Sequence, residues 1–156
     1  MDTEANDVGP RTRVGRPEDA PALARLGAPS EHAAHEQVLR ERLELPPGED
    51  HFVLVAEEPS SSAALFGYIS GGGSRDEDRK GSAEIYELVV APVADAPVAA
   101  ALLLQAAITI LAGAGYDQVG LWLAARSSFG ASGLEEAGFA PDGATRAGAR
   151  RYSRVL

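Results

Sequence analysis

One continuous stretch constrains the fold of this chain more than any other, because it combines a strand, a tight turn and a long apolar helix. Residues 83–90 read AEIYELVV, a run of mostly β-forming apolar residues that Pro92 ends. Asp95 then precedes Pro97, the pattern of an N-cap residue followed by proline in the first helical turn. A strand that ends at a helix N-terminus can form an anion-binding site, because the free N–H groups of the helix point at the ligand.

The helix that follows is predicted to be buried on nearly all sides. From Val98 to Leu111 only Gln105 and Thr109 are polar, and a helix that is apolar all round is normally buried. Gly113 predicts its end. Because the apolar run is short and has clear ends, we expect a core helix and not a membrane span.

Length and composition predict a single domain over residues 11–156, after a disordered tail over residues 1–10. The absence of cysteine excludes disulfides, thiol catalysis and zinc–thiolate sites. The formal net charge of −9, from 14 basic and 23 acidic residues, argues against nucleic acid and membranes as partners and weakly favours cationic ones. The N-terminus is polar and shows no hydrophobic signal segment, so we expect a cytoplasmic protein.

Further patterns predict strands and helices on both sides of the central stretch. Strands are expected at residues 11–16, 51–57, 63–70, 116–124, 139–141 and 150–156, and helices at 17–27, 30–45 and 127–137. The glycine-rich segment 71–82 is expected to be a loop. Asp19 and Ser30 are predicted to cap the first two helices. The resulting order, β-α-α-β-β-β-α-β-α-β-β, predicts an α+β fold with a mixed sheet and helices on its faces.

Two histidines on the second predicted helix raise the question of a metal site. His32 and His35 lie three residues apart. Zinc sites need at least three protein ligands, and no third ligand is evident in the sequence. We therefore expect no metal and two exposed histidines.

The element order and several short motifs resemble the GNAT superfamily of N-acetyltransferases over nearly all of residues 11–156. The matching positions are Leu88, Val90 and Pro92 for L-x-V-x-P, Leu102–Leu104 for the helix body, and Glu135, Gly138 and Phe139 for E-x-x-G-F. The resemblance implies a mostly antiparallel sheet of six to seven strands with about four helices, in which strands four and five splay apart around acetyl-CoA. It also implies direct transfer of the acetyl group to an amine, with acetyl-CoA as the cosubstrate.

The segment that binds the CoA pyrophosphate in this family departs here from its usual R-G-x-G-x-G pattern. The corresponding positions are Asp95, Ala96, Pro97, Val98, Ala99 and Ala100, and only Ala100 is an accepted variant. Pro97 lacks an N–H, and Val98 adds bulk where a glycine is usual. A carboxylate about 5 Å from one phosphate charge costs roughly 3 kcal/mol at an effective dielectric near 20, whereas a helix N-terminus returns about 0.3–2 kcal/mol. If Asp95 points into the site, repulsion is therefore the larger effect.

The resemblance implies three further cofactor contacts outside that loop. Val89 and Val90 would pair through their backbones with the pantetheine arm, and Ser127 occupies the position of an asparagine that steadies CoA. The family's acid tyrosine falls on Leu134, which has no proton to donate.

Acid–base chemistry would need other groups. Amine attack requires a general base, and two glutamates of the predicted strand are candidates. If the strand has no bulge, Glu84 aligns best with family members that use a strand glutamate, and Glu87 lies nearer the splay. Because they are three residues apart, they are expected to face opposite sides of a regular strand. Either could instead be solvated or paired with an arginine. Water, Tyr86 or Tyr152 would have to replace the missing acid.

Three hypotheses about function stay open. The first is an acyl-CoA-dependent N-acyltransferase that acts on a small-molecule or peptide amine, and the sequence favours it. The second is an inactive GNAT-like domain that has lost CoA and serves as a binding or dimerisation module, its groove filled by side chains such as Val98. The third is a small-ligand sensor of α+β type. A homodimer would be compatible with an open sheet edge.

Overall fold

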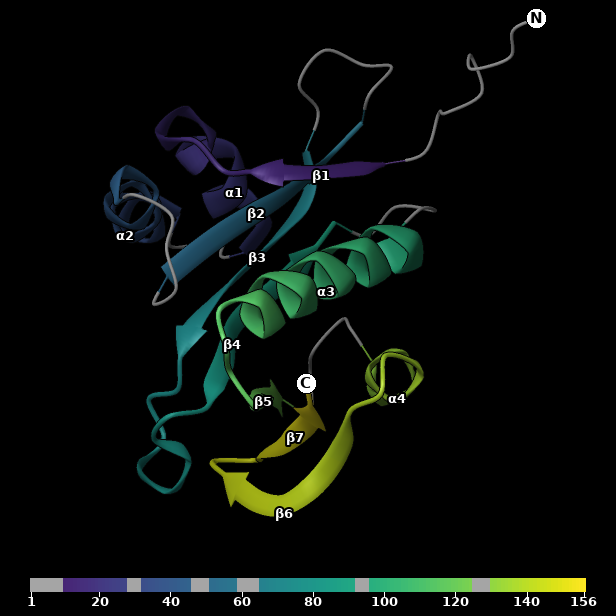
Figure 1. The fold of residues 1–156 in the computed structure, drawn as a ribbon. Coiled ribbons are helices and arrows are strands. Elements are labelled where there is room, and N and C mark those ends of the chain that lie inside the picture. The colour runs from purple at the N-terminus through teal and green to yellow at the C-terminus, as the bar shows by residue number, and fades with distance from the viewer. Residues whose placement is uncertain (1–9, 28–31, 46–50, 59–64, 92–95, 125–129) are drawn as a thin grey trace, which may run out of the picture.

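The computed structural model describes residues 10–27, 32–45, 51–58, 65–91, 96–124 and 130–156. Within these ranges the chain forms one seven-stranded sheet with four α-helices (Figure 1). The strands are β1 (Arg11–Val14), β2 (His51–Glu57), β3 (Leu65–Gly73), β4 (Ala83–Val90), β5 (Gln118–Ala124), β6 (Ala140–Arg146) and β7 (Ala149–Val155). The helices are α1 (Ala20–Gly27), α2 (His32–Glu44), α3 (Ala96–Gly113) and α4 (Ala131–Glu136), with short 3-10 turns η2 (Pro17–Asp19) and η4 (Glu77–Arg79). The α+β class and the predicted order of elements are confirmed.

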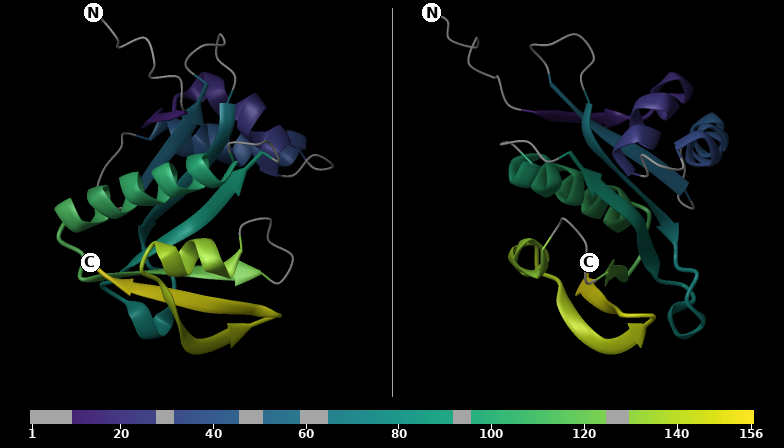
Figure 2. Two further views of the ribbon diagram at one scale, coloured as in Figure 1. Left: turned by 90° about the vertical axis from the view of Figure 1, so that its right-hand side faces the viewer. Right: turned by 180° about the vertical axis from the view of Figure 1, so that it is seen from behind.

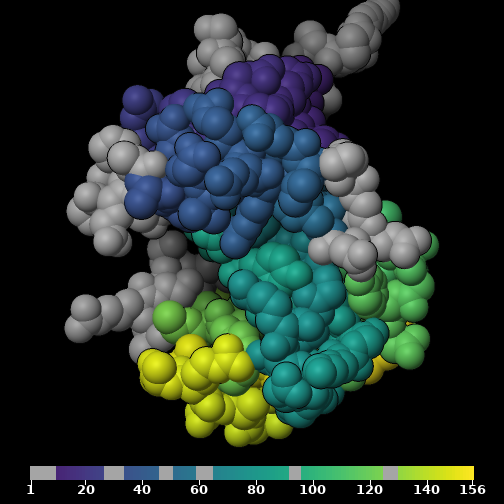
Figure 3. Space-filling view, turned by 90° about the vertical axis from the view of Figure 1, so that its left-hand side faces the viewer, coloured from purple at the N-terminus to yellow at the C-terminus, as the bar shows by residue number. Residues whose placement is uncertain are grey.

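The helices cover both faces of the sheet, and each face has its own hydrophobic core (Figure 2). On one face α3 and α4 pack against the strands through a core that includes Ile69, Leu103, Leu121 and Leu134. On the other face α1 and α2 pack over β2 and β3. Figure 3 views this second face and shows that α1 and α2 cover its upper part, while the segment around η4 reaches the surface below them.

The sheet order is β1-β2-β3-β4-β5-β7-β6, and β4 and β5 are neighbours that run parallel. Their pairing covers Ala83 to Ile85 of β4, opposite Val119 to Leu121 of β5. Beyond Ile85, β4 continues to Val90 with β3 alone as its partner in the described structure. The two strands therefore diverge in the middle of the sheet, as the resemblance implied.

A β-bulge in β4 overturns the prediction that Glu84 and Glu87 face opposite sides. The register between β3 and β4 shifts by one residue, which leaves Tyr86 as the extra residue of β4. Ile85 and Leu88 both pack against the α3-side core, although they too are three residues apart. Glu84 and Glu87 consequently both lie on the opposite face, the one that α1 and α2 partly cover.

The glycine triplet predicted as the start of a loop is instead the end of β3. Gly71 lies between β2 and β4, and a Cβ atom there would lie 2.6 Å from the carbonyl oxygen of Glu84 and 2.9 Å from Cζ of Phe52. Glycine is needed at this position because two neighbouring chains approach its Cα closely. The triplet lengthens the sheet.

Helix α3 is buried on one side only, contrary to the prediction. Seven of its residues are buried against the sheet, but Val98 and Leu102 on the other side are 52% and 38% exposed. By length and hydropathy alone it could cross a membrane, and 39% of its apolar window is buried inside the protein. The outer side stays open because a helix lying on one sheet face contacts that face along a single stripe.

Asp19 does not cap α1 as predicted. Its carboxylate instead accepts hydrogen bonds from the backbone N–H of Arg16 at 2.8 Å and from two guanidinium nitrogens of Arg13 at 2.9 and 3.0 Å. Burial alone would raise the pKa of Asp19, but these hydrogen bonds lower it below its ordinary value. The residue ties η2 to β1. The other predicted cap, Ser30, lies outside the described residues.

Candidate active site

The divergence of β4 and β5 opens a pocket of about 50 Å³ between the two strands. Its lining residues are Ile85, Tyr86, Glu87 and Leu88 of β4 and Leu121, Trp122 and Leu123 of β5. A buried water needs about 10–15 Å³ on the same scale, so the pocket has room for a group of a few heavy atoms. A larger hollow of about 80 Å³ lies between β1, β2 and α2, but its ionisable lining residues are Arg42 and His51 and it has no carboxylate.

The unpaired edge of β4 presents backbone groups to this opening. Ala91 donates its N–H to the carbonyl of Phe66 at 2.6 Å, and hydrogen-bonded pairs alternate along an antiparallel ladder. Val89 therefore directs its backbone groups at β3, whereas those of Leu88 and Val90 point into the space beside β5. Of the two valines that the resemblance nominated, Val90 has the orientation that a ligand lying in the splay could reach.

Glu87 lies at the pocket and is held by three donors from other elements. Its Oε1 accepts hydrogen bonds from Nη1 of Arg42 on α2 at 2.8 Å and from the hydroxyl of Ser70 on β3 at 3.3 Å. Its Oε2 accepts a hydrogen bond from the hydroxyl of Tyr68 at 3.0 Å. The Glu87 side chain is 25% exposed, so the carboxylate is oriented but not sealed from the pocket.

His35 extends this cluster on α2. Its Nε2 lies 3.0 Å from the Tyr68 hydroxyl and 3.6 Å from Oε2 of Glu87. The Tyr68 hydroxyl donates its hydrogen to Glu87, so it can only accept a hydrogen bond from His35. His35 therefore carries a hydrogen on Nε2 and donates it to the Tyr68 oxygen. Burial, and next the negative charge of Glu87, raise the pKa of Tyr68 and keep it neutral. His35 is only 20% exposed, so the prediction of an exposed histidine is wrong: α2 packs over β3 and presses the ring onto Tyr68.

Glu84 has a different environment from Glu87. It is 3% exposed, and its carboxylate accepts the backbone N–H of Arg75 at 2.8 Å and Nη2 of Arg75 at 3.0 Å. Both oxygens are thus bound to the segment that follows β3. This arrangement fixes Arg75 in place and leaves Glu84 little access to a reacting group.

The first turn of α3 is open to solvent beside the splay. Ala96 and Val98 retain backbone N–H groups that the helix itself cannot use, while Pro97 has none. The Val98 side chain is half exposed and does not fill a groove, whereas the methyl groups of Ala99 and Ala100 are buried in the core. Asp95 and Ser127, two other predicted cofactor contacts, lie outside the described residues.

The residues at the family's acid position and the tyrosines that could replace it differ in their access to the pocket. Leu134 is fully buried on α4, and Tyr152 is 3% exposed in the same core and does not line the pocket. Tyr86 lines the pocket, but its hydroxyl donates to the carbonyl of Gly73 at 2.5 Å. Burial raises the pKa of Tyr86.

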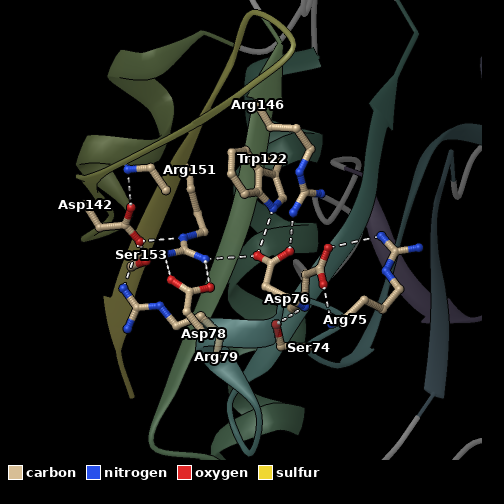
Figure 4. A network of polar contacts seen from close by, with 12 residues as sticks. Ser74, Arg75, Asp76, Asp78, Arg79, Trp122, Asp142, Arg146, Arg151 and Ser153 are labelled. Carbon is tan, nitrogen blue, oxygen red and sulfur yellow. Dashed lines mark hydrogen bonds and ion pairs between the residues drawn. The ribbon is translucent and has the colours of Figure 1, made fainter.

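Below the pocket, a network of charged side chains joins η4 to the C-terminal strands (Figure 4). Arg151 of β7, 5% exposed, binds Asp76 at 3.1 Å, Asp78 at 2.7 Å and Asp142 at 2.7 Å. Burial alone would raise the pKa of Asp142, but hydrogen bonds from Ser153, the Ala144 N–H, Arg151 and Arg79 lower it well below its ordinary range. The network holds η4 against β6 and β7 beside the pocket, since a buried guanidinium with three carboxylate partners resists displacement.

Sequence reasoning missed four residues that surround Glu87. They are His35, Arg42, Tyr68 and Ser70. One signal was available: Tyr68 and Ser70 are two apart on a strand and must share a face. Nothing in the sequence indicated that α2 would bring His35 and Arg42 to that face. Among the described residues no cluster of potential metal ligands occurs.

The divergent parallel pair inside an otherwise antiparallel sheet, with α3 starting beside the opening, defines the GNAT fold. The chain superposes on a GCN5-related N-acetyltransferase from Kribbella flavida with a TM-score of 0.76 and 15% identity, covering 95% of this chain and 98% of that one. A PaiA N-acetyltransferase from Thermoplasma acidophilum, solved in complex with coenzyme A, gives 0.67 and 19% over 95% and 99%. An aminoglycoside 6′-N-acetyltransferase from Enterococcus faecium gives 0.71 and 13% over 92% and 96%.

These TM-scores establish a common fold. No family model matches the chain, and no curated protein matches it in sequence.

Proposed function

We propose that this protein is an acetyl-CoA-dependent N-acetyltransferase that acts on an amine. The observation that carries the proposal is the position of Glu87, a carboxylate oriented by Arg42, Tyr68 and Ser70 at the pocket where β4 and β5 diverge. The solved structures that share the fold are named as N-acetyltransferases, one of them in complex with coenzyme A, and this supports the assignment.

Acetyl-CoA would lie in the splay between the two strands. The backbone groups of Leu88 and Val90 that point away from β3 offer an unpaired strand edge, to which an extended amide-containing arm can add. The exposed first turn of α3 offers the N–H groups of Ala96 and Val98 to a phosphate. Val98 is half exposed and does not line the pocket, which argues against a pocket filled by this side chain.

When bound, acetyl-CoA supplies an activated thioester whose acetyl group is transferred to the amine. Glu87 accepts the proton that the amine must lose, directly or through one water. Arg42, Ser70 and Tyr68 hold its carboxylate toward the pocket, and His35 fixes the Tyr68 hydroxyl. We assign the proton taken up by the CoA thiolate to water, because the Tyr86 hydroxyl is bonded to Gly73.

Of the two candidate bases, Glu87 is therefore preferred. Glu84 is buried and bound through both oxygens to Arg75, so its role is to position that segment. The acceptor class is a small-molecule or peptide amine. One protein that shares the fold is named for acetylating an aminoglycoside, a small-molecule amine, which supports this class.

Calorimetric titration with acetyl-CoA and with free CoA tests the proposal. We expect binding in the micromolar range, followed by release of free thiol when a panel of amines is added. Absence of heat up to millimolar ligand would contradict the proposal. It would mean that the departures at Asp95, Pro97 and Val98 close the cofactor site, and that the domain binds another partner.

A further inference from the structure

Two arginines stand at the rim of the pocket, each stacked on an aromatic ring that lines it. The guanidinium carbon of Arg75 lies 4.1 Å from the ring centre of Tyr86, and that of Arg146 lies 4.2 Å from the ring centre of Trp122. Arg75 follows β3 and Arg146 ends β6, and the rings they contact belong to the two strands that line the pocket, Tyr86 to β4 and Trp122 to β5. Neither arginine takes part in the chemistry described above.

A buried carboxylate holds each guanidinium by one edge (Figure 4). Arg75 donates Nη2 to Glu84 at 3.0 Å, and Arg146 donates Nη2 to Asp76 at 2.7 Å. Both carboxylates are only 5% exposed, whereas the arginine side chains are 60% and 61% exposed. The positive groups therefore lie outermost, with their counter-charges beneath them.

The two guanidinium groups are preorganised for an anion. An arginine carries five N–H donors in a planar fork, and in both residues the described contacts use few of them. Stacking and the buried ion pair restrict the rotamers in advance, which lowers the entropy that a ligand must overcome on binding. A planar carboxylate matches the geometry of such a fork.

Building on the proposed function, we propose that Arg75 and Arg146 bind a carboxylate of the acceptor, so that the acceptor is an amine that also carries a carboxylate. Its amino group would reach Glu87, which lines the same pocket, while its carboxylate stays at the rim. This proposal reverses the preference for cationic partners suggested by the net charge of −9. Each guanidinium is far more exposed than the carboxylate paired with it, so an approaching anion meets the guanidinium first.

The test compares matched acceptors. L-methionine and L-phenylalanine are each assayed beside the corresponding α-carboxamide, with kcat/KM as the readout. We expect the wild type to favour the acid for at least one pair. We expect Arg75→Gln and Arg146→Gln each to lower the acid-to-amide ratio of kcat/KM about tenfold or more. Arg150→Gln is the control, because Arg150 is exposed on β7 and stacks 5.8 Å from Tyr152, outside the pocket; it should leave the ratio unchanged.

Calorimetric titration of the same acids and amides without acetyl-CoA separates this proposal from the proposed function. If the wild type binds an acid and the variants Arg75→Gln and Arg146→Gln do not, the result supports carboxylate binding by the two arginines, even if acetyl-CoA does not bind. Acetyl transfer with no preference for acids, or a ratio unmoved in both variants, overturns the rim assignment and leaves the transferase standing. Urea unfolding of each variant identifies losses that come from folding. Asp76 keeps Arg151 and Trp122 as partners in Arg146→Gln, so this variant is expected to fold.

Discussion

Glu84 and Glu87 lie on the same face of β4, although three residues separate them along a strand. The extra residue at Tyr86 shifts the alternation of side chains by one position, so that both carboxylates face away from α3. Their surroundings then divide their roles. Glu84 is enclosed by Arg75, and Glu87 opens on the pocket with Tyr68 and Arg42 behind it.

Replacing the proposed base tests this division. Glu87→Gln keeps the size of the side chain but cannot accept the proton of the amine, so we expect kcat to fall about 100-fold or more. The affinity for acetyl-CoA in calorimetry should be unchanged, because the strand edge and the first turn of α3 are untouched. If Glu87→Gln retains wild-type kcat while Glu84→Gln loses it, the assignment of the base is wrong.

The close approach at Gly71 predicts a large effect of one added methyl group. In Gly71→Ala the new Cβ would meet the Glu84 carbonyl at 2.6 Å and the Phe52 ring at 2.9 Å. Since backbone cannot move aside cheaply, we expect a loss of about 1–3 kcal/mol in the free energy of unfolding by urea. The matched control is Gly113→Ala at the end of α3, where nothing lies within 4 Å; it should leave stability unchanged or raise it. Equal effects in the two variants would rule out the steric explanation.

The buried guanidinium of Arg151 predicts a strong dependence of stability on this single charge. Arg151→Met would leave Asp76 and Asp142, whose side chains are 5% and 14% exposed, with fewer partners. We expect a loss of about 2–3 kcal/mol in urea unfolding, at the low end for a broken buried pair because Asp78 is solvated. Arg150 precedes Arg151 on β7 and is exposed, so Arg150→Met should change the free energy of unfolding by less than about 0.5 kcal/mol. Similar losses for both would show that the network contributes little.

The lowered pKa of Asp142 predicts how stability depends on acid. The unfolded carboxyl titrates near its ordinary pKa of 3.8, and the folded one titrates at lower pH. Its contribution to stability is therefore fully present above about pH 5 and is lost as the pH falls through 3.8 toward the folded pKa. Asp142→Asn should show a weaker loss of stability between about pH 4 and pH 2, measured by urea unfolding at each pH.

Much of the fold could be predicted from local patterns. β2 follows the predicted span 51–57 because its apolar run is long and uninterrupted. The splay of β4 and β5 could be expected from the order of elements once the motifs around Leu88 and Gly138 were recognised. Errors occurred where a neighbour decided the outcome. Gly71 belongs to a strand because two adjacent strands pair with it, and local propensity assigned it to a loop.

The candidate site was predicted less completely than the fold. Glu87 was recognisable from its place on a strand that ends before a helix. His35 and Arg42 were not, since they approach Glu87 only through the packing of α2 on β3. The rim arginines were equally hidden, because Arg75 and Arg146 are 71 residues apart in number, on segments joined by the network around Asp76 and Arg151.

The sequence by itself determined the number, order and type of the main elements, because hydrophobic periodicity and glycine or proline stops act over a few residues. It also determined that no thiol chemistry is available. Tertiary structure decided which face each side chain of β4 presents, since one bulged residue reverses every position beyond it. It likewise decided that a buried tyrosine, a histidine and an arginine surround one glutamate. Such contacts depend on how distant segments pack, and no local pattern encodes them.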